Sequence, residues 1–313
     1  MSLHRHRRQL TRDDLAGILD LAGVGTLAHY AELTQASYNT AYRIRLADDT
    51  GLVLKVAPDP AAPGLTHEHG LMRTEALFYQ AAQGKIPVPR PVHAGRAGDH
   101  EFLLMTELPG ENWVTSPPAD RDRLRHELGT HVAALHEITG DCFGYPQNEP
   151  APTWRAAFTG MLADILGDAR HYQVQLPEIR DLMAANEHLL DTVETPVLVH
   201  FDLWDGNILR HEGRISGIVD GERAFWGDPI AELASLSIFG DIRRDQAFLD
   251  GYGGVDFDDG TRRRLAMYRG YLFMIMITET APRGYEGAEH EKIMALARRL
   301  LLEQLEILRA PAG

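Results

Sequence analysis

The hydrophobic pattern divides this chain into two unequal parts. Residues 31–57 alternate apolar and polar side chains around the turn-forming sequence ADDTG, which predicts an antiparallel hairpin. A helix at residues 67–83 and strands at residues 91–95 and 102–107 complete a small β-rich part. Beyond residue 119 the pattern is mainly helical, at residues 120–137, 154–170, 177–194, 261–280 and 286–309. We therefore predict an α+β fold with two lobes.

The break between the two parts falls at the sequence LPGENW, residues 108–113, which interrupts the periodicity. We predict an N-terminal lobe of residues 1–107 and a helical C-terminal lobe of residues 108–313. At the start of the chain, Thr11 followed three positions later by Asp14 predicts the cap of a first helix.

A cluster of polar side chains lies in the only strand-like region of the second part. The strand PVLVH ends near His200, so Asp202 and Asn207 fall on the tight loop that follows it. Asp220 leaves the next apolar strand, and if the two strands pair its carboxylate faces the same point. Two carboxylates and an amide oxygen are what phosphoryl transfer needs to position a hydroxyl and to bind Mg²⁺.

These motifs resemble those of the aminoglycoside phosphotransferases and related small-molecule kinases. The resemblance implies a bilobal protein-kinase-like fold, ATP and Mg²⁺ as cofactors, Asp202 as the catalytic base, and Asn207 and Asp220 as metal ligands. The family usually has His-Gly-Asp where this chain has His200-Phe201-Asp202, so Phe201 puts the loop geometry in question. The sequence DLWDGN is also similar to fructosamine kinases.

The resemblance extends to the predicted nucleotide site. Lys55 in the strand LVLKVA is similar to the lysine that contacts the α- and β-phosphates, and we expect it to pair with Glu75 in preference to Glu68. The sequence LTQASYNTAYRI replaces a glycine-rich loop. The resemblance implies that Ser37, Tyr38 and Asn39 of this segment cover the phosphates. It also implies that the strand FLLMTELPG binds the adenine through the backbone of Thr106, Glu107 and Leu108.

Composition narrows the partners and the compartment. The formal charge of −14 and the absence of a basic patch argue against nucleic acid. The longest apolar run, residues 271–277, is too short to span a bilayer, and no targeting segment is visible. A single cysteine, Cys142, excludes an internal disulfide framework, so we expect a cytoplasmic protein. The oligomeric state cannot be read from the sequence.

The leading hypothesis is an ATP-dependent phosphotransferase that acts on a hydroxyl of a small polar molecule, such as an aminoglycoside-like antibiotic. The acidic balance would suit a cationic acceptor, although the general solubility of a cytosolic protein is the better explanation for it. Alternatives are a metabolite kinase of the fructosamine or homoserine type and a nucleotide-binding module without catalysis. For Trp204 and Trp226 the alternatives are lining a substrate rim and packing in the core, and we expect packing in the core. Unranked candidates for acceptor binding are Asp228, Glu232, Glu279 and Glu286.

Overall fold

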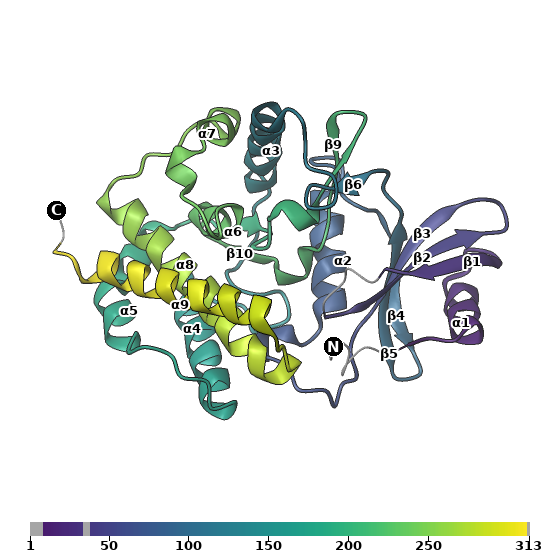
Figure 1. Cartoon of the computed structure of the whole chain (residues 1–313), viewed down its shortest axis with the longest axis horizontal. Helices are drawn as coiled ribbons and strands as arrows, with labels where there is room; N and C mark the ends of the chain where they lie inside the picture. The colour runs from purple at the N-terminus through teal and green to yellow at the C-terminus, as the bar shows by residue number, and fades with distance from the viewer. Residues whose placement is uncertain (1–8, 34–37, 312–313) are drawn as a thin grey trace.

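The computed structural model describes residues 9–33 and 38–311 and has two lobes (Figure 1). The N-terminal lobe contains a five-stranded antiparallel sheet in the order β1-β2-β3-β5-β4. The predicted α+β class and two-lobed architecture are confirmed. In chain order the five strands span Leu27–Glu32, Thr40–Leu46, Gly51–Val56, Pro91–Ala97 and His100–Thr106.

Alternating side chains let this sheet bury both of its faces. On β5, Phe102 and Leu104 pack in the cluster that contains helix α1 (Arg12–Ala22). The intervening Leu103 packs in the larger cluster that contains α2 (Leu71–Ala82). Helix α1 lies on the outer side of the sheet, whereas α2 lies between the sheet and the helical lobe (Figure 1). Helix α2 is therefore placed to carry side chains into the junction of the lobes.

The two N-terminal helices begin where local backbone chemistry allows. Thr11 and Asp14 form the predicted capping box of α1, which is confirmed. The helix predicted from residue 67 begins only at Leu71, because Gly70 has a left-handed backbone with φ 72°. The residues before it, Thr66–Glu68, form a 3₁₀ turn instead.

Helix α8 (Asp259–Arg283) is the central helix of the C-terminal lobe and contacts α4, α6 and α9. The helix predicted over residues 177–194 is shorter, because α5 ends at Asn186 and continues as a 3₁₀ turn. Helices α6 and α7 were not predicted, and they are only one to two turns long. No helix of the described residues is both long and apolar enough to cross a membrane. The remaining helices are α3 (Arg121–His136), α4 (Trp154–His171), α5 (Arg180–Asn186), α6 (Glu232–Leu236), α7 (Gln246–Tyr252) and α9 (Ala288–Arg309).

Five short strands hold the loops at the junction of the lobes. Strands β8 (Ile208–His211) and β9 (Arg214–Ile218) form a hairpin, and β6 (Glu111–Asn112) adds to its edge. The strand that ends near His200, β7 (Val197–Val199), does not pair with the strand before Asp220, because it pairs with β10 (Phe225–Gly227). The loop after β7 is thus fixed from both sides. The proposed lobe boundary between residues 107 and 108 falls in the connection from β5 to β6.

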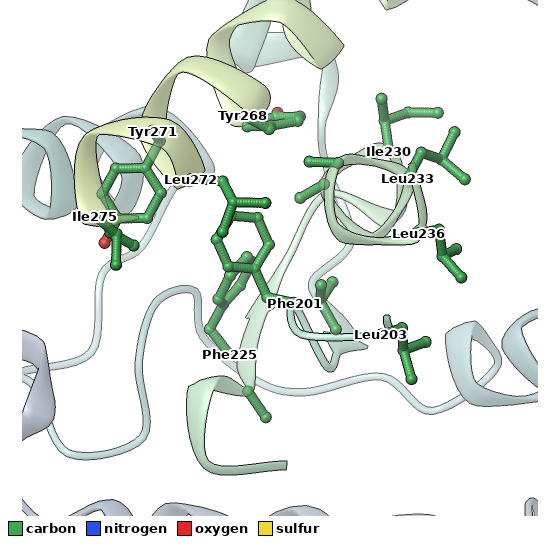
Figure 2. Packing of buried hydrophobic residues seen from close by; sticks show 14 of the residues in the cluster. Phe201, Leu203, Phe225, Ile230, Leu233, Leu236, Tyr268, Tyr271, Leu272 and Ile275 are labelled. Carbon is green, nitrogen blue, oxygen red and sulfur yellow. The ribbon is translucent and has the colours of Figure 1, made fainter. Parts of the chain in front are cut away.

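Phe201 occupies the loop after β7 with a left-handed backbone, φ 62°, which glycine adopts without strain. Its ring is 1 % exposed and lies between Phe225 and Tyr271, with centroid distances of 5.1 and 5.9 Å (Figure 2). A non-glycine residue in this conformation costs about 1–2 kcal/mol, and burial of a phenylalanine ring contributes more than that. Core packing therefore compensates for the backbone strain.

Replacing Phe201 should separate these two effects. We expect Phe201→Ala to lower the free energy of unfolding by about 3–5 kcal/mol, because it empties the space of a buried ring and keeps the strained backbone. Phe201→Gly should be more stable than Phe201→Ala by about 1 kcal/mol, because glycine removes the strain. Denaturant titration would measure both values.

The control is Phe225 in β10, which has a similarly buried ring and no left-handed backbone. At Phe225 the alanine variant should be the more stable of the pair, since glycine weakens a strand. If the alanine variant were more stable than the glycine variant at both positions, the conclusion that the backbone of Phe201 is strained would be contradicted.

Candidate active site

Asp202 and Asn207 are joined within the loop between β7 and β8. The Asn207 amide nitrogen donates to the Asp202 carbonyl oxygen at 2.8 Å and to its carboxylate at 3.1 Å. Because the nitrogen makes both contacts, the amide oxygen is the atom of this side chain that could bind a cation. The backbone carbonyl oxygen of Asn207 accepts a hydrogen bond from the backbone N–H of Val219, which brings the loop beside Asp220.

A buried carboxylate of α6 holds the start of this loop. Glu232 is fully buried and accepts from the backbone N–H groups of His200 at 2.7 Å and Phe201 at 3.0 Å. The imidazole Nε2 of His200 lies 3.0 Å from the Val219 carbonyl oxygen, which ties the loop to the end of β9. His200 thus supports the loop. These contacts fix the peptide units that precede Asp202.

The candidates for acceptor binding are therefore reduced. Glu232 is committed to the loop, and Asp228 is 2 % exposed and accepts from Tyr268 at 2.7 Å and Arg264 at 2.9 Å. Both expectations were wrong, because a buried carboxylate with its partners in place is not available to an acceptor. Glu279 lies at the junction of the lobes, where its carboxylate pairs with Arg223.

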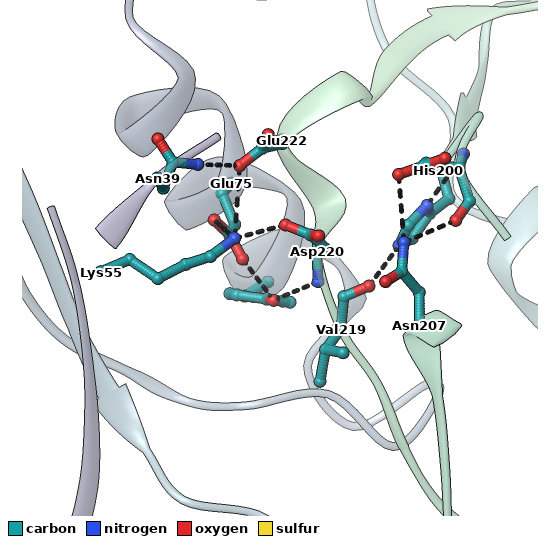
Figure 3. Close-up of polar contacts among 10 residues, drawn as sticks. Asn39, Lys55, Glu75, His200, Asn207, Val219, Asp220 and Glu222 are labelled. Atoms are coloured by element: carbon teal, nitrogen blue, oxygen red, sulfur yellow. Dashed lines mark hydrogen bonds and ion pairs between the residues drawn. The ribbon is translucent and has the colours of Figure 1, made fainter. Parts of the chain in front are cut away.

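Lys55 of β3 lies at the centre of a cluster of carboxylates (Figure 3). Its ammonium nitrogen is 2.7 Å from Glu75 of α2 and 3.3 Å from Glu222, and it also pairs with Asp220. The Tyr79 hydroxyl donates to Glu75 at 2.6 Å and accepts from the Asp220 backbone N–H at 2.9 Å. Elements from both lobes thus converge on one cation.

Burial and charge act in opposite directions on this cluster. Burial lowers the pKa of Lys55, but its three carboxylate partners outweigh burial and raise that pKa well above its ordinary value. Burial raises the pKa of Asp220, but the ammonium of Lys55 brings it below the ordinary value. Burial raises the pKa of Glu222 to about 8, with Lys55 only partly offsetting it. The cluster therefore holds excess negative character that a cation would relieve.

The backbone explains how Asp220 and Glu222 both reach Lys55. Asp220 has a left-handed backbone, φ 69°, at the end of β9. Gly221 packs so tightly against Phe78 of α2 that a Cβ atom there would lie 2.3 Å from the ring. The sequence Asp-Gly-Glu is thus pressed onto α2. Sequence reasoning missed Glu222, although its position two residues beyond Asp220 was the available signal.

The segment predicted to cover the phosphates is partly described. Ser37 lies outside the described residues. Asn39 is 3 % exposed, and its amide nitrogen donates to the Glu222 carboxylate. The Tyr38 ring lies under the guanidinium of Arg283. Asn39 is thus linked through Glu222 to Lys55.

The residues predicted to bind adenine have some of their groups engaged already. The backbone N–H of Thr106 donates to the Arg90 carbonyl at 3.0 Å, and that of Glu107 donates to Gly51 at 3.2 Å. The Glu107 carboxylate pairs with Arg43 at 2.6 Å. These two backbone N–H groups are therefore already engaged within the protein, and binding of adenine by this connection stays a prediction.

Asp202 is surrounded by charges of both signs. Burial raises the pKa of Asp202 to about 7, although the Arg223 guanidinium partly offsets the effect. Arg223 also pairs with Glu279 of α8 at 2.9 Å. The candidate base thus lies in an environment where it can exchange a proton near neutral pH.

Trp204 is an exposed aromatic ring two residues after Asp202. The side chain is 45 % exposed, so the expectation that it packs in the core is wrong. A Cβ atom at Gly206 would lie 2.3 Å from the ring, so the ring lies directly against that glycine. Trp226 is half-buried and packs against Gly140. Trp204 therefore presents an exposed aromatic ring on the loop that carries the candidate base.

The two-lobed fold and the charged cluster between its lobes define a class, the small-molecule phosphotransferases of protein-kinase-like fold. The sequence model of the phosphotransferase enzyme family, APH, matches residues 29–268. The chain therefore belongs to this family.

Relatives with described functions include both metabolite and antibiotic kinases. A probable ketoamine kinase of Synechocystis is 27 % identical over 221 residues, covering 64 % of this chain and 70 % of the relative. The crystal structure of a putative fructosamine-3-kinase from Thermobifida fusca has a TM-score of 0.70 at 24 % identity, covering 94 % of this chain and 100 % of that one. The ternary complex of aminoglycoside phosphotransferase APH(4)-Ia with ADP and hygromycin B has a TM-score of 0.66 at 16 % identity, covering 95 % and 98 %. The structural matches confirm the protein-kinase-like fold.

The raised pKa of Asp202 predicts a pH-dependent cost in stability. Between its ordinary value of 3.8 and about 7, the folded chain holds a proton that the unfolded chain releases, so this group's contribution to stability falls as pH rises through that window. Asp202→Asn has no proton to lose. Its free energy of unfolding should therefore exceed that of the wild type by on the order of 2 kcal/mol at pH 8, and by less at pH 5.

Urea titrations at the two pH values, without divalent cations or nucleotide, would measure this difference. The control is Asp205→Asn in the same loop, which removes the paired contacts of Asp205 with Arg121 at 2.9 and 3.0 Å. It should lower stability slightly at pH 8. A gain in stability for Asp205→Asn, or none for Asp202→Asn, would contradict the role of burial at Asp202.

Proposed function

We propose that this protein transfers the γ-phosphoryl group of ATP to a hydroxyl of a small amine-bearing sugar derivative of the ketoamine type. The observation that carries the proposal is the convergence of Lys55 and Glu75 from one lobe with Asp220 from the other, next to the loop that carries Asp202. Such a site supplies a cation for phosphates, ligands for a metal and a base for a hydroxyl.

The donor site uses side chains from both lobes. Lys55, held by Glu75, binds phosphate oxygens as a compact point charge. Asp220, Glu222 and the Asn207 amide oxygen offer the oxygen donors that Mg²⁺ prefers. The carboxylate oxygens of Asp220 and Glu222 lie within 4.8 Å of each other, so the donor set fits a divalent cation. Bound Mg²⁺ would neutralise charge between the phosphates.

Asp202 orients the acceptor hydroxyl and accepts its proton as the bond from the hydroxyl oxygen to the γ-phosphorus forms and the bond from that phosphorus to the leaving ADP breaks. Because the transition state is loose, correct placement of the hydroxyl matters more than a strong base. The hydrogen bond from Asn207 fixes the carboxylate, and a pKa of about 7 leaves much of it ionised at neutral pH. The same loop thus positions the base and one metal ligand.

The charge near the base favours a singly charged sugar amine over a polycationic aminoglycoside as the acceptor. The exposed ring of Trp204, on the same loop as Asp202, offers a flat apolar surface that suits the C–H face of a sugar, which both kinds of acceptor have. The acidic side chains near the base are balanced by arginines, since Glu279 pairs with Arg223 at 2.9 Å. A polycation would meet these guanidinium groups as like charges. The similarity to ketoamine kinases supports the same choice.

A panel of acceptors tests this proposal. ATP consumption should be stimulated by a fructosyl-amine, and the product should carry one phosphate by mass spectrometry. Homoserine and the aminoglycosides kanamycin and hygromycin B should give little stimulation. Turnover of the aminoglycosides alone would overturn the choice of acceptor. Binding of Mg·AMP-PNP without turnover of any acceptor would instead favour a module without catalysis.

Asp202→Asn should lower kcat with the preferred acceptor by about 10²–10⁴-fold, because the hydroxyl loses its proton acceptor. Binding of Mg·AMP-PNP, measured by calorimetry, should change little, since Asp202 does not contact Lys55. Asp205→Asn is the matched control and should keep most of the activity. Equal turnover by Asp202→Asn and the wild type would exclude Asp202 as the base.

A further inference from the structure

Arg283 joins the last turn of α8 to the N-terminal lobe. Its guanidinium lies 4.5 Å from the centre of the Tyr38 ring and pairs with Glu68, which precedes α2. It also pairs with Glu279, one turn earlier in α8, at 3.2 Å. The Arg283 side chain is only 7 % exposed and that of Glu68 is 3 % exposed. These contacts cross between the lobes and are shielded from solvent.

Tyr38 belongs to the segment that replaces a glycine-rich loop. The next residue, Asn39, donates to Glu222, which pairs in turn with Lys55. The described end of this segment is thus held at two points, by Arg283 through Tyr38 and by Glu222 through Asn39. A loop that lacks the glycine pattern needs other contacts to keep a fixed position over phosphates. In this chain the side chains of Arg283 and Glu222 provide such contacts, to Tyr38 and to Asn39.

We propose that Arg283 is a positioning residue for nucleotide binding, which holds the phosphate-covering segment at Tyr38 over the Lys55 site. The inference rests on the proposed function, because it requires that this segment covers a nucleotide. Arg283 touches neither Lys55 nor Asp220. It acts through the face of the Tyr38 ring and through Glu68, which fixes the connection between β3 and α2.

Physical chemistry supports a specific role for arginine at this position. A planar guanidinium can stack on an aromatic face and bind two carboxylates at its edge, which a lysine ammonium cannot do together. Such stacking is strongest where the cation is desolvated, as Arg283 is. Glu279 also pairs with Arg223, the neighbour of Asp202, so this one turn of α8 contacts groups on both the donor and the acceptor side.

Arg283→Gln should weaken binding of Mg·AMP-PNP about tenfold by calorimetry and raise the KM for ATP more than it lowers kcat. Arg283→Lys keeps the charge without the planar face, and it should have an intermediate effect. The matched control is Arg125→Gln. Arg125 is 6 % exposed, pairs with Asp245 at 2.7 Å and lies 5.1 Å from the Phe248 ring, within the C-terminal lobe. The Arg125→Gln variant should lose about as much stability as Arg283→Gln and should keep the nucleotide affinity of the wild type.

A double-mutant cycle tests whether Arg283 acts through Tyr38. Tyr38→Leu should weaken nucleotide binding more than Tyr38→Phe, and Arg283→Gln combined with Tyr38→Leu should be no weaker than the weaker single variant. Additive losses would overturn the proposal, as would unchanged affinity in Arg283→Gln while the wild type binds. If Arg283→Gln does not fold, Arg283→Lys replaces it in the cycle. Failure of the wild type to bind Mg·AMP-PNP would overturn the proposed function itself.

Discussion

The buried ammonium of Lys55 is the interaction on which the rest of the site depends. It neutralises Glu75 from α2 and Asp220 from the end of β9, and each of these carboxylates would be costly to bury alone. Without Lys55 the two lobes would present like charges to one another. The pairing therefore joins the sheet to the helical lobe, and it is the cluster in which we propose that a metal and phosphates bind.

Strained backbone lies on both sides of this cluster. Phe201 and Asp220 have left-handed backbones. Phe201 directly precedes Asp202, and Asp220 is itself a residue of the candidate site. Such conformations persist only where the surroundings determine them. Here the ring of Phe201 is buried against α8, and Asp220 is held by Lys55 and Tyr79. Packing in the helical lobe thus sets the direction in which Asp202 points.

The sequence was sufficient to predict the main elements of both lobes, but not the short helices α6 and α7. It also predicted that Asp202, Asn207 and Asp220 lie close together, because a strand pattern ends just before each loop. Glu232 was misjudged because an acidic residue in a short helix looks exposed until its backbone partners are known. Trp204 was misjudged because burial of a loop residue depends on the fold around it. Arg283 could not be found at all, since its partner Glu68 is 215 residues away.

The charges around Asp202 bear on which acceptor this fold selects. An acidic protein with 45 carboxylate side chains against 31 basic ones suggests affinity for cations in general. Next to the base, however, Arg223 and Arg283 compensate Glu279 and Glu68. Because salt screens exposed charges beyond a Debye length of about 8–10 Å and screens buried pairs much less, the local balance outweighs the net charge of the surface. This local balance of charge is the ground on which we propose an acceptor of low net charge in preference to a polycation.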